Sequence, residues 1–447
     1  MTDKKTMDRR SFLKNSAAGM LGAGVLGGKS LLGAEGQKAD EAAKIVEYRT
    51  LGRTGFEASD ISSGGPFDEG ILSALLDAGV NYIDTAESYG NGQSETIVGK
   101  VMKGRDRKKV FITTKQLVSP LPGMPVKDEE VTKEAIINRF QKSLERMQTD
   151  YADCLMMHGV DNVEALNHEG YHAAVKQLKA DGRLKFAGLS NHGTFHPVDS
   201  KEPMGKVLLA AAEDGRFDVY LMTHNFLKQE QSEEVLKVCK EKGIGTTLMK
   251  TNPVGSYFGI KEAIARLEKE GKDVPEFYTK ALAKFKTKYE EAEGFLKQYN
   301  LEDPAAIKEA ALKFCLSNPH VNAICLSFRN FDDVDKYVKL SGTRLTPADE
   351  TALSAYAQSF GQFYCRHACG LCETQCPHNV RVNTVMRFNH YFAAQGREKY
   401  AMERYASLQA GKADVCQNCT GHCESACPYN VPVRMLLSLA HRNLTLA

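Results

Sequence analysis

The stretch GVNYIDTAESYG, residues 79–90, begins with a short apolar run and ends in polar side chains. Similar apolar runs recur along the chain, at Ile61–Ser63, Val110–Lys115, Tyr151–His158, Phe186–Asn191, Val219–Asn225, Ile244–Lys250 and Val321–Phe328. Amphipathic stretches such as 134–147 and 233–242 lie between them. Strands that alternate with helices predict a parallel α/β architecture. Eight such units between residues 47 and 346 predict a (β/α)8 TIM barrel.

A doubly wound open sheet is the competing fold for this pattern. Such a sheet usually carries a Gly-x-Gly-x-x-Gly turn after a strand, and no predicted strand is followed by one here. One connection between predicted strands is long, and its residues 260–299 are rich in Lys, Glu and Ala with helical spacing. We expect helices on the barrel rim there, with a solvated charged face or, alternatively, a lid over the substrate.

The 447-residue chain is long enough for two or three domains, and its 42% hydrophobic content is typical of a soluble protein with a core. No apolar run reaches the roughly 18 residues that a membrane-spanning helix needs. The net charge of +2 does not indicate a nucleic-acid partner. Residues 1–34 carry six Lys or Arg and two Asp, a charge of +4, so the remainder of the chain is at about −2.

That basic N-terminal segment has the features of a targeting sequence. Asp8-Arg9-Arg10-Ser11-Phe12-Leu13-Lys14 precedes a weakly apolar stretch from Ala17 to Ala34. It resembles a twin-arginine export signal, which sends folded proteins across a membrane. We expect residues 1–34 to be this signal, with the twin-arginine translocation machinery as a partner and the periplasm as the destination. Membrane attachment follows if the signal is not cleaved, and a disordered basic tail is the alternative.

The cysteines divide into two sets. Four of the twelve are scattered, and such cysteines are most often small buried core residues. The other eight form two runs: Cys365, Cys369, Cys372 and Cys376 before Pro377, and Cys416, Cys419, Cys423 and Cys427 before Pro428. Both runs closely match the bacterial ferredoxin run, in which the fourth Cys ligates the other cluster. We therefore predict two [4Fe-4S] clusters in a small, mostly helical ferredoxin-like domain at residues 361–447.

Two other uses of these cysteines compete with the clusters. Zinc sites usually pair two close cysteines with a second pair some 12 or more residues away, unlike these runs. Disulfides are chemically allowed if the protein is exported, but cysteines this close would close small strained loops. The steps Asn379-Val380 and Asn430-Val431 after the two prolines repeat each other and indicate an internal duplication. At one place in each run, three residues separate neighbouring cysteines where the strict ferredoxin run has two residues. This spacing resembles that of helical dicluster ferredoxins.

Five segments of the barrel region together resemble the aldo-keto reductase family. They are Glu47–Gly55, Gly79–Gly90, Ile112–Lys115, Leu155–His158 and Gly188–Asn191, in that order. The resemblance covers residues 47–346. It implies a barrel that reduces carbonyl groups with NADPH.

The resemblance implies a catalytic tetrad of Asp84, Tyr89, Lys115 and His158. Tyr89 matches the proton donor for the forming alkoxide. An unperturbed Tyr has a pKa of roughly 10, too high for efficient work near neutrality. We expect the Lys115 ammonium to lower that pKa, Asp84 to hold Lys115 in place, and His158 to orient the substrate oxygen.

The same resemblance implies a set of NADP(H)-binding residues. Ser190 and Asn191 match the positions that hold the nicotinamide carboxamide. Lys250 matches a residue that approaches the pyrophosphate, while Arg329 and Asn330 match residues that meet the 2′-phosphate and the adenine.

Some positions depart from the family pattern. Leu221 stands where a Gln is expected, His224 where a Tyr is common, and Leu326-Ser327 where Pro-Gly is usual. These departures weaken the nicotinamide prediction more than the tetrad prediction. Free NADPH is also scarce outside the cytoplasm, so a tightly held cofactor carried through export is expected if the signal is real.

These features predict an exported oxidoreductase that reduces a carbonyl or oxidises an alcohol, a sugar being one candidate substrate. The clusters would pass electrons to or from a partner electron-transfer protein. The alternative is an electron carrier on the same scaffold without nicotinamide turnover. A third possibility is that the clusters are structural and fasten the C-terminal segment over the barrel.

Overall fold

The computed structural model describes residues 43–119, 126–192, 202–253 except 228 and 230, 304–360, 364–366, 369–393, 397–429 and 431–445, with a few single positions between 264 and 274. The chain divides into two units, Met1–Glu41 and Ala42–Ala447. The predicted export signal at residues 1–34 and most of the predicted rim helices at residues 260–299 lie outside the described residues.

Eight parallel strands close into a barrel in the order β10-β3-β4-β5-β6-β7-β8-β9. Their bounds are β3 (Ile61–Gly64), β4 (Tyr82–Asp84), β5 (Phe111–Gln116), β6 (Ala152–Met157), β7 (Leu184–Asn191), β8 (Val219–Thr223), β9 (Gly245–Met249) and β10 (Ala323–Leu326). Each predicted apolar run overlaps one of these strands. The prediction of a (β/α)8 barrel is therefore confirmed, and the open doubly wound sheet is excluded.

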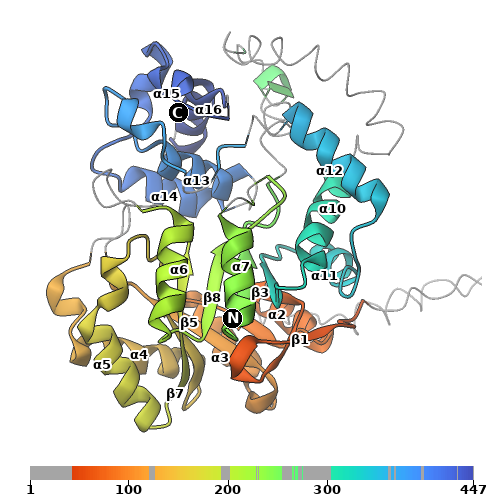
Figure 1. Cartoon of the computed structure of the whole chain (residues 1–447), viewed down its shortest axis with the longest axis vertical. Helices are drawn as coiled ribbons and strands as arrows, with labels where there is room; N and C mark the ends of the chain where they lie inside the picture. Colours follow the sequence, from red (N-terminus) through yellow and green to blue (C-terminus); the bar gives the residue numbers. More distant parts are fainter. Residues whose placement is uncertain are drawn as a thin grey trace, which may run out of the picture. The chain divides into compact units, whose positions relative to one another are not determined.

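A helix follows each strand of the barrel (Figure 1). In chain order they are α2 (Glu69–Asp77), α3 (Gln93–Met102), α4 (Lys133–Met147), α5 (Glu169–Ala180), α6 (Met204–Asp214), α7 (Ser232–Glu241), α10 (Pro304–Ser317) and α11 (Phe331–Val338). Local sequence fixes where some of them begin: Asp68 caps α2 and Thr132 caps α4, each accepting a hydrogen bond from a backbone N–H of the first turn. Their apolar faces pack on the strands in one large core.

A short antiparallel hairpin precedes the barrel, formed by β1 (Tyr48–Thr50) and β2 (Glu57–Ser59). Leu51, in its turn, is fully buried in a cluster that includes Tyr82 and Phe111, the first residues of β4 and β5. The hairpin therefore closes the N-terminal end of the barrel. Short 3-10 helices lie at Gly52–Thr54, Arg107–Lys109, Asp128–Glu130, Glu164–Asn167, Glu373–Gln375 and Asp414–Asn418.

The C-terminal part of the chain is helical. It comprises α12 (Pro347–Phe360), α13 (Val382–Ala393), α14 (Glu398–Ala406), α15 (His422–Ser425) and α16 (Val433–Leu444), with α13, α14 and α16 in mutual contact (blue in Figure 1). Their apolar side chains share a second core with Phe226 and Leu227, which follow β8, and with Ile307 of α10. The C-terminal helices thus pack around a core made mainly of their own side chains, and a few barrel residues extend that core. Within the described residues, no helix has the length and hydropathy to cross a membrane.

Gly188 in β7 is expected to be sterically required. A Cβ at this position would lie 2.6 Å from the Val219 carbonyl oxygen and 2.8 Å from the Met156 side chain. We expect Gly188→Ala to destabilise the fold by about 1–3 kcal/mol, since an overpacked strand must shift against its neighbours. Chemical denaturation of both proteins measures this loss.

Gly205 of α6 offers the matched control, because a Cβ there would meet Gln231 only at an ordinary 3.4 Å. Gly205→Ala should leave stability unchanged or raise it, since Ala favours helix over Gly by about 1 kcal/mol. Equal stability of the two variants would contradict the steric argument.

Candidate active site

Polar side chains gather at the C-terminal ends of neighbouring strands. Asp84 ends β4, Lys115 lies near the end of β5, and His158 follows β6 directly. Tyr89 lies in the loop between β4 and α3. Because parallel strands all end on the same side of the barrel, these residues meet at one end, opposite the hairpin. The structure therefore brings all four sequence-predicted tetrad residues together.

Lys115 is the centre of this group. Its ammonium donates hydrogen bonds to Asp84 Oδ2 at 2.6 Å, to the Thr85 carbonyl at 2.8 Å and to the Tyr89 hydroxyl at 3.5 Å. Lys115 is fully buried and Asp84 nearly so. Burial by itself would lower the pKa of Lys115, but the Asp84 carboxylate and the Tyr89 hydroxyl outweigh it and raise that pKa. The ammonium therefore stays charged at neutral pH.

The environment of Tyr89 has the opposite net effect from the one expected from sequence. Burial raises its pKa to about 12, although the Lys115 ammonium, whose Nζ lies 4.8 Å from the ring centroid, lowers it. Asp84 and Tyr391 raise it further and Arg397 lowers it. Lys115 acts in the predicted direction, but desolvation is the larger effect. Tyr89 is therefore a neutral phenol, able to donate a proton, across the physiological range.

His158 lies beside Tyr89, with its ring edge-on at 5.8 Å between centroids. Its Nδ1 is 3.4 Å from the Ser88 hydroxyl. Burial lowers its pKa well below the usual value, and the charges of Lys115, Arg387 and Arg404 lower it further. A neutral imidazole keeps one N–H, which can donate a hydrogen bond to a substrate oxygen.

A cavity of about 200 Å³ adjoins the tetrad and is lined by Asp84, Tyr89 and His158. Of the residues predicted to bind the cofactor, Lys250 and Arg329 also line it. Ser190 and Asn191 are fully buried at the end of β7.

The remaining cofactor predictions are placed away from that lining. The Ser190 hydroxyl accepts a hydrogen bond from the Gly159 N–H. Asn330 caps α11 by accepting from the Asp333 N–H at 2.8 Å. Leu221 does line the cavity, whereas His224 stacks on Phe314 inside the protein.

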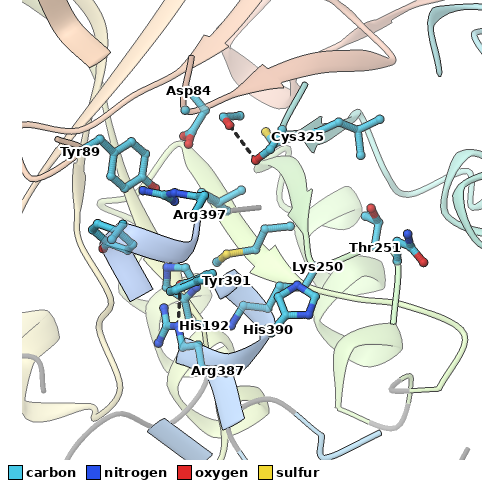
Figure 2. A pocket seen from close by; sticks show the side chains of 18 of the residues that line it. Asp84, Tyr89, His192, Lys250, Thr251, Cys325, Arg387, His390, Tyr391 and Arg397 are labelled. Carbon is cyan, nitrogen blue, oxygen red and sulfur yellow. Dashed lines mark hydrogen bonds between the residues drawn. The ribbon is translucent and has the colours of Figure 1, made fainter. Parts of the chain in front are cut away.

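The opposite side of the cavity comes from the C-terminal helices (Figure 2). We call this side the C-terminal wall; it consists of Thr384, Arg387, Phe388, His390, Tyr391, Arg397, Tyr400 and Arg404. Sequence reasoning treated this region only as a helical connection between the cysteine runs. A signal was available, because Arg387 and Tyr391, and likewise Arg397, Tyr400 and Arg404, recur at the three- and four-residue spacing of one helix face.

The eight clustered cysteines fall into two spatial groups. Cys365, Cys369, Cys372 and Cys427 line a second cavity together. Burial raises the pKa of Cys365 well above its usual value, and the other three thiols of that group raise it further. Burial likewise raises the pKa of Cys416 to about 12, with Cys423, Cys376 and Cys419 adding to the effect. Each group thus combines three cysteines of one run with the fourth of the other.

Hydrogen bonds around the two runs repeat each other. Glu373, next to Cys372, accepts from the Asn383 N–H at 2.7 Å, and Glu424, next to Cys423, accepts from the Arg434 N–H at 3.0 Å. None of the twelve cysteines, all of which lie in the described part of the chain, forms a disulfide. Among the described residues, no three His, Cys, Asp or Glu side chains are grouped to hold a single metal ion.

Comparison with known proteins agrees with the barrel geometry. Residues 67–357 match the model of the aldo/keto reductase family. The chain belongs to this family. Its barrel is accordingly that of an oxidoreductase acting on carbonyl or alcohol groups.

Individual relatives resemble parts of the chain. The "Probable aldo-keto reductase 1" of Glycine max is 27% identical over 267 residues, which are 56% of this chain and 72% of the relative. Aldo-keto reductase YhdN of Bacillus subtilis (strain 168) is 30% identical over 221 residues, 45% of this chain and 61% of the relative. The solved structure of aldo-keto reductase AKR11C1 from Bacillus halodurans (holo form) is 21% identical, with a TM-score of 0.48, covering 69% of this chain and 95% of that one.

The buried pair of Asp84 and Lys115 should show strong energetic coupling. Asp84→Asn leaves a buried ammonium without its carboxylate, which is expected to cost about 3–5 kcal/mol. Lys115→Met should cost a similar amount, because it strands the carboxylate. The double variant should be more stable than the sum of the two losses predicts, since it leaves neither charge unpaired. Denaturant unfolding of the four proteins measures the coupling, and strictly additive losses would contradict it.

Proposed function

We propose that this aldo/keto reductase reduces the carbonyl group of a small molecule, or oxidises the corresponding alcohol, with NADP(H) and with two [4Fe-4S] clusters in its C-terminal part. The observation that carries the catalytic proposal is the Lys115 ammonium, hydrogen-bonded to both Asp84 and the Tyr89 hydroxyl at the cavity. Aldehydes and sugars form the first panel of substrates to assay.

The tetrad has the geometry for proton transfer to a carbonyl oxygen. Tyr89 would donate its proton to the oxygen as it becomes an alkoxide, and Lys115 would stabilise the phenolate that remains. Asp84 would keep the ammonium charged and fixed. His158, neutral, would donate a hydrogen bond to the same oxygen and orient it. Each of these roles uses a side chain that the cavity or its buried floor already presents.

The cavity also has residues that fit a nicotinamide cofactor. NADP(H), when bound, would supply or accept the hydride that changes the oxidation state of the carbon. Lys250 and Arg329, cations on the barrel side of the cavity, would hold its phosphate groups. Leu221 occupies part of the same lining, so the nicotinamide ring would meet an apolar side chain there.

Tyr89→Phe should reduce carbonyl turnover by about 10²–10⁴-fold, the usual contribution of a general acid. The change removes one hydroxyl, so iron content and the melting temperature should stay as in the wild type. NADPH oxidation with each aldehyde or sugar, measured under anaerobic conditions, gives the result. Equal turnover in both proteins would refute the acid assignment.

The pH dependence tests the same residue. Reduction requires protonated Tyr89, and its pKa of about 12 lies above the assay range, so the rate should stay level from pH of about 6 to about 9. Oxidation requires the phenolate, whose fraction rises about tenfold per pH unit below the pKa, so that rate should climb. The ionisable groups that act on the pKa of Tyr89 from its surroundings are Lys115, Asp84, Tyr391 and Arg397. A reduction rate that falls with a midpoint near neutrality would contradict a buried neutral phenol.

The grouping of the cysteines supports the two clusters. A four-iron cubane is larger than a single ion, and four thiolates around a small cavity suit its four iron corners. The cavity lined by Cys365, Cys369, Cys372 and Cys427 has this arrangement. The other group consists of Cys376, Cys416, Cys419 and Cys423. Exchange of the fourth ligand between the runs is the pattern of dicluster ferredoxins.

Helix α13 supports a functional link between the clusters and the catalytic cavity. Val382 and Asn383 line the cysteine cavity, while Thr384 and Arg387 line the catalytic cavity. A helix rises 1.5 Å per residue, so Asn383 and Arg387 are about 6 Å apart along its axis. This proximity suits electron exchange between the clusters and the site, and also a role for the clusters in fixing the C-terminal wall.

An electron carrier without nicotinamide turnover is the second candidate, and the same proximity favours it. Anaerobic titration distinguishes the two. NADPH binding with Tyr89-dependent turnover supports the enzyme. Reversible one-electron reduction of the clusters without nucleotide binding would leave only the carrier.

Cys372→Ser should cost the protein about half of its iron and acid-labile sulfide, because one of two four-iron clusters loses a ligand. Cys239→Ala is the control, since Cys239 is buried in α7 of the barrel wall. Iron and sulfide analysis of the anaerobically purified proteins provides the measurement. Unchanged iron in Cys372→Ser, or iron-free wild-type protein, would refute ligation.

Export of the folded protein by the twin-arginine route remains part of the proposal. It rests on Arg9 and Arg10 and on the weakly apolar stretch that follows them. A protein that acquires its clusters in the cytoplasm would need a route for folded chains, so the two proposals are mutually consistent.

A further inference from the structure

The catalytic cavity has a second, positively charged side that the family barrel does not supply. The family match ends at residue 357, whereas the C-terminal wall begins at Thr384. Three arginines of this wall, Arg387, Arg397 and Arg404, line the cavity. The acidic residues of the described lining are Asp84 and Asp333, and both come from the barrel.

Those two carboxylates are already engaged with barrel groups. Asp84 pairs with Lys115, and Asp333 accepts a hydrogen bond from the Arg329 backbone N–H at 2.9 Å. Within the described residues, neither forms an ion pair with an arginine of the C-terminal wall. The described lining of the cavity therefore carries more basic than acidic side chains, although the whole chain is nearly neutral.

Arg397 is held mainly by aromatic rings. Its guanidinium carbon lies 4.1 Å from the centroid of Tyr400, 4.8 Å from that of Phe67 and 5.6 Å from that of Tyr391. Phe67 belongs to the barrel, so this contact also joins the wall to the catalytic end. Aromatic faces fix the guanidinium plane and leave its N–H groups for a planar anion. Among the described residues, no carboxylate forms an ion pair with it.

The arginines lie next to the reacting groups. Figure 2 shows Arg397 directly beside Tyr89, with Arg387 and Tyr391 further along the wall. The Arg387 Nε donates to the Tyr391 hydroxyl at 2.6 Å, which fixes its position. Arg397 is close enough to lower the pKa of Tyr89, and Arg387 and Arg404 are close enough to lower that of His158.

The positive charge of this region comes from arginine and lysine rather than from histidine. Burial lowers the pKa of His158 and of His192 well below the usual value. It also lowers that of His390 to about 3, with Lys250 and Arg387 adding to the effect. These imidazoles are neutral at physiological pH, so they add no positive charge to this side of the cavity.

We propose that Arg397, with Arg387 and Arg404, forms an anion subsite beside the reacting carbonyl, and that the natural substrate carries a carboxylate or a phosphate ester within a few bonds of that carbonyl. This inference rests on the proposed carbonyl chemistry and narrows its substrate class. The cofactor phosphates are assigned elsewhere, to Lys250 and Arg329 on the barrel side. Arg397 is thus a specificity-determining residue.

The test compares matched anionic and neutral substrates. 4-Formylbenzoate is paired with 4-methylbenzaldehyde, and glyceraldehyde 3-phosphate with glyceraldehyde. The holoenzyme should prefer the anionic member in kcat/KM by at least about tenfold, as charge-assisted hydrogen bonds to arginine imply. Preference in the first pair identifies a carboxylate site, and preference in the second a phosphate site. Equal kcat/KM in both pairs would overturn the proposal.

Two variants locate the preference. Arg397→Met should lower the anionic-to-neutral ratio by about tenfold or more, and Arg397→Lys should retain part of it because the charge persists. Lys399→Met is the control, since Lys399 is an exposed cation of α14 outside the cavity lining, and its ratio should match the wild type. A raised KM for NADPH in Arg397→Met with an unchanged ratio would assign the arginine to the cofactor and refute the subsite.

Binding without turnover separates this inference from the proposed function. Calorimetric titration with 4-formylbenzoate in the absence of NADPH should show binding to the wild type that weakens about tenfold in Arg397→Met. If no carbonyl is turned over but this difference holds, the enzyme proposal fails and the subsite stands. If carbonyls are turned over but Arg397→Met matches the wild type in both the kcat/KM ratio and the affinity for 4-formylbenzoate, the enzyme proposal stands and the subsite fails. If Arg397→Met folds poorly, Arg404→Met replaces it, and the anionic-to-neutral ratio of kcat/KM should likewise fall.

Discussion

The buried ion pair between Lys115 and Asp84 is the interaction on which the active site depends. The register of the barrel creates it: Asp84 pairs with Thr113 across β4 and β5, and Lys115 lies two residues further on the same face. An ammonium in a fully buried position is costly unless a partner and hydrogen bonds compensate for the loss of water. Asp84 and the Thr85 carbonyl provide that compensation, which leaves the third donor of Lys115 directed toward Tyr89.

Burial decides the state of this site as much as charge does. Tyr89 would be a stronger acid in water beside a lysine, but the cavity that surrounds it raises its pKa. The C-terminal wall also acts on the phenol through charge, since Tyr391 raises its pKa and Arg397 lowers it. The C-terminal helices are consequently part of the environment of Tyr89, the candidate acid.

Much of the barrel could be predicted from sequence because its determinants are local. Short apolar runs that alternate with amphipathic stretches are sufficient to predict eight strands and their helices, and an ordered set of motifs indicated which polar residues meet at the strand ends. The net pKa of Tyr89 could not be predicted, because it depends mainly on burial in the folded protein and also on Tyr391 and Arg397, some 300 residues away in sequence. The C-terminal wall was missed for the same reason: helical spacing of arginines and tyrosines shows a common face but not what that face meets. Ser190 and Asn330 were assigned by resemblance alone. In the structure Ser190 accepts a hydrogen bond from the Gly159 N–H, and Asn330 caps α11.

Helix α13 presents consecutive residues, Asn383 and Thr384, to two different cavities. Each residue of an α-helix is rotated by about 100° from the one before, so the loss or gain of a single residue near this point would turn one of the two sets away from its cavity. Transfer of the C-terminal segment to another barrel would therefore require the same number of residues before α13. In this part of the chain, substitutions should be tolerated far better than insertions or deletions.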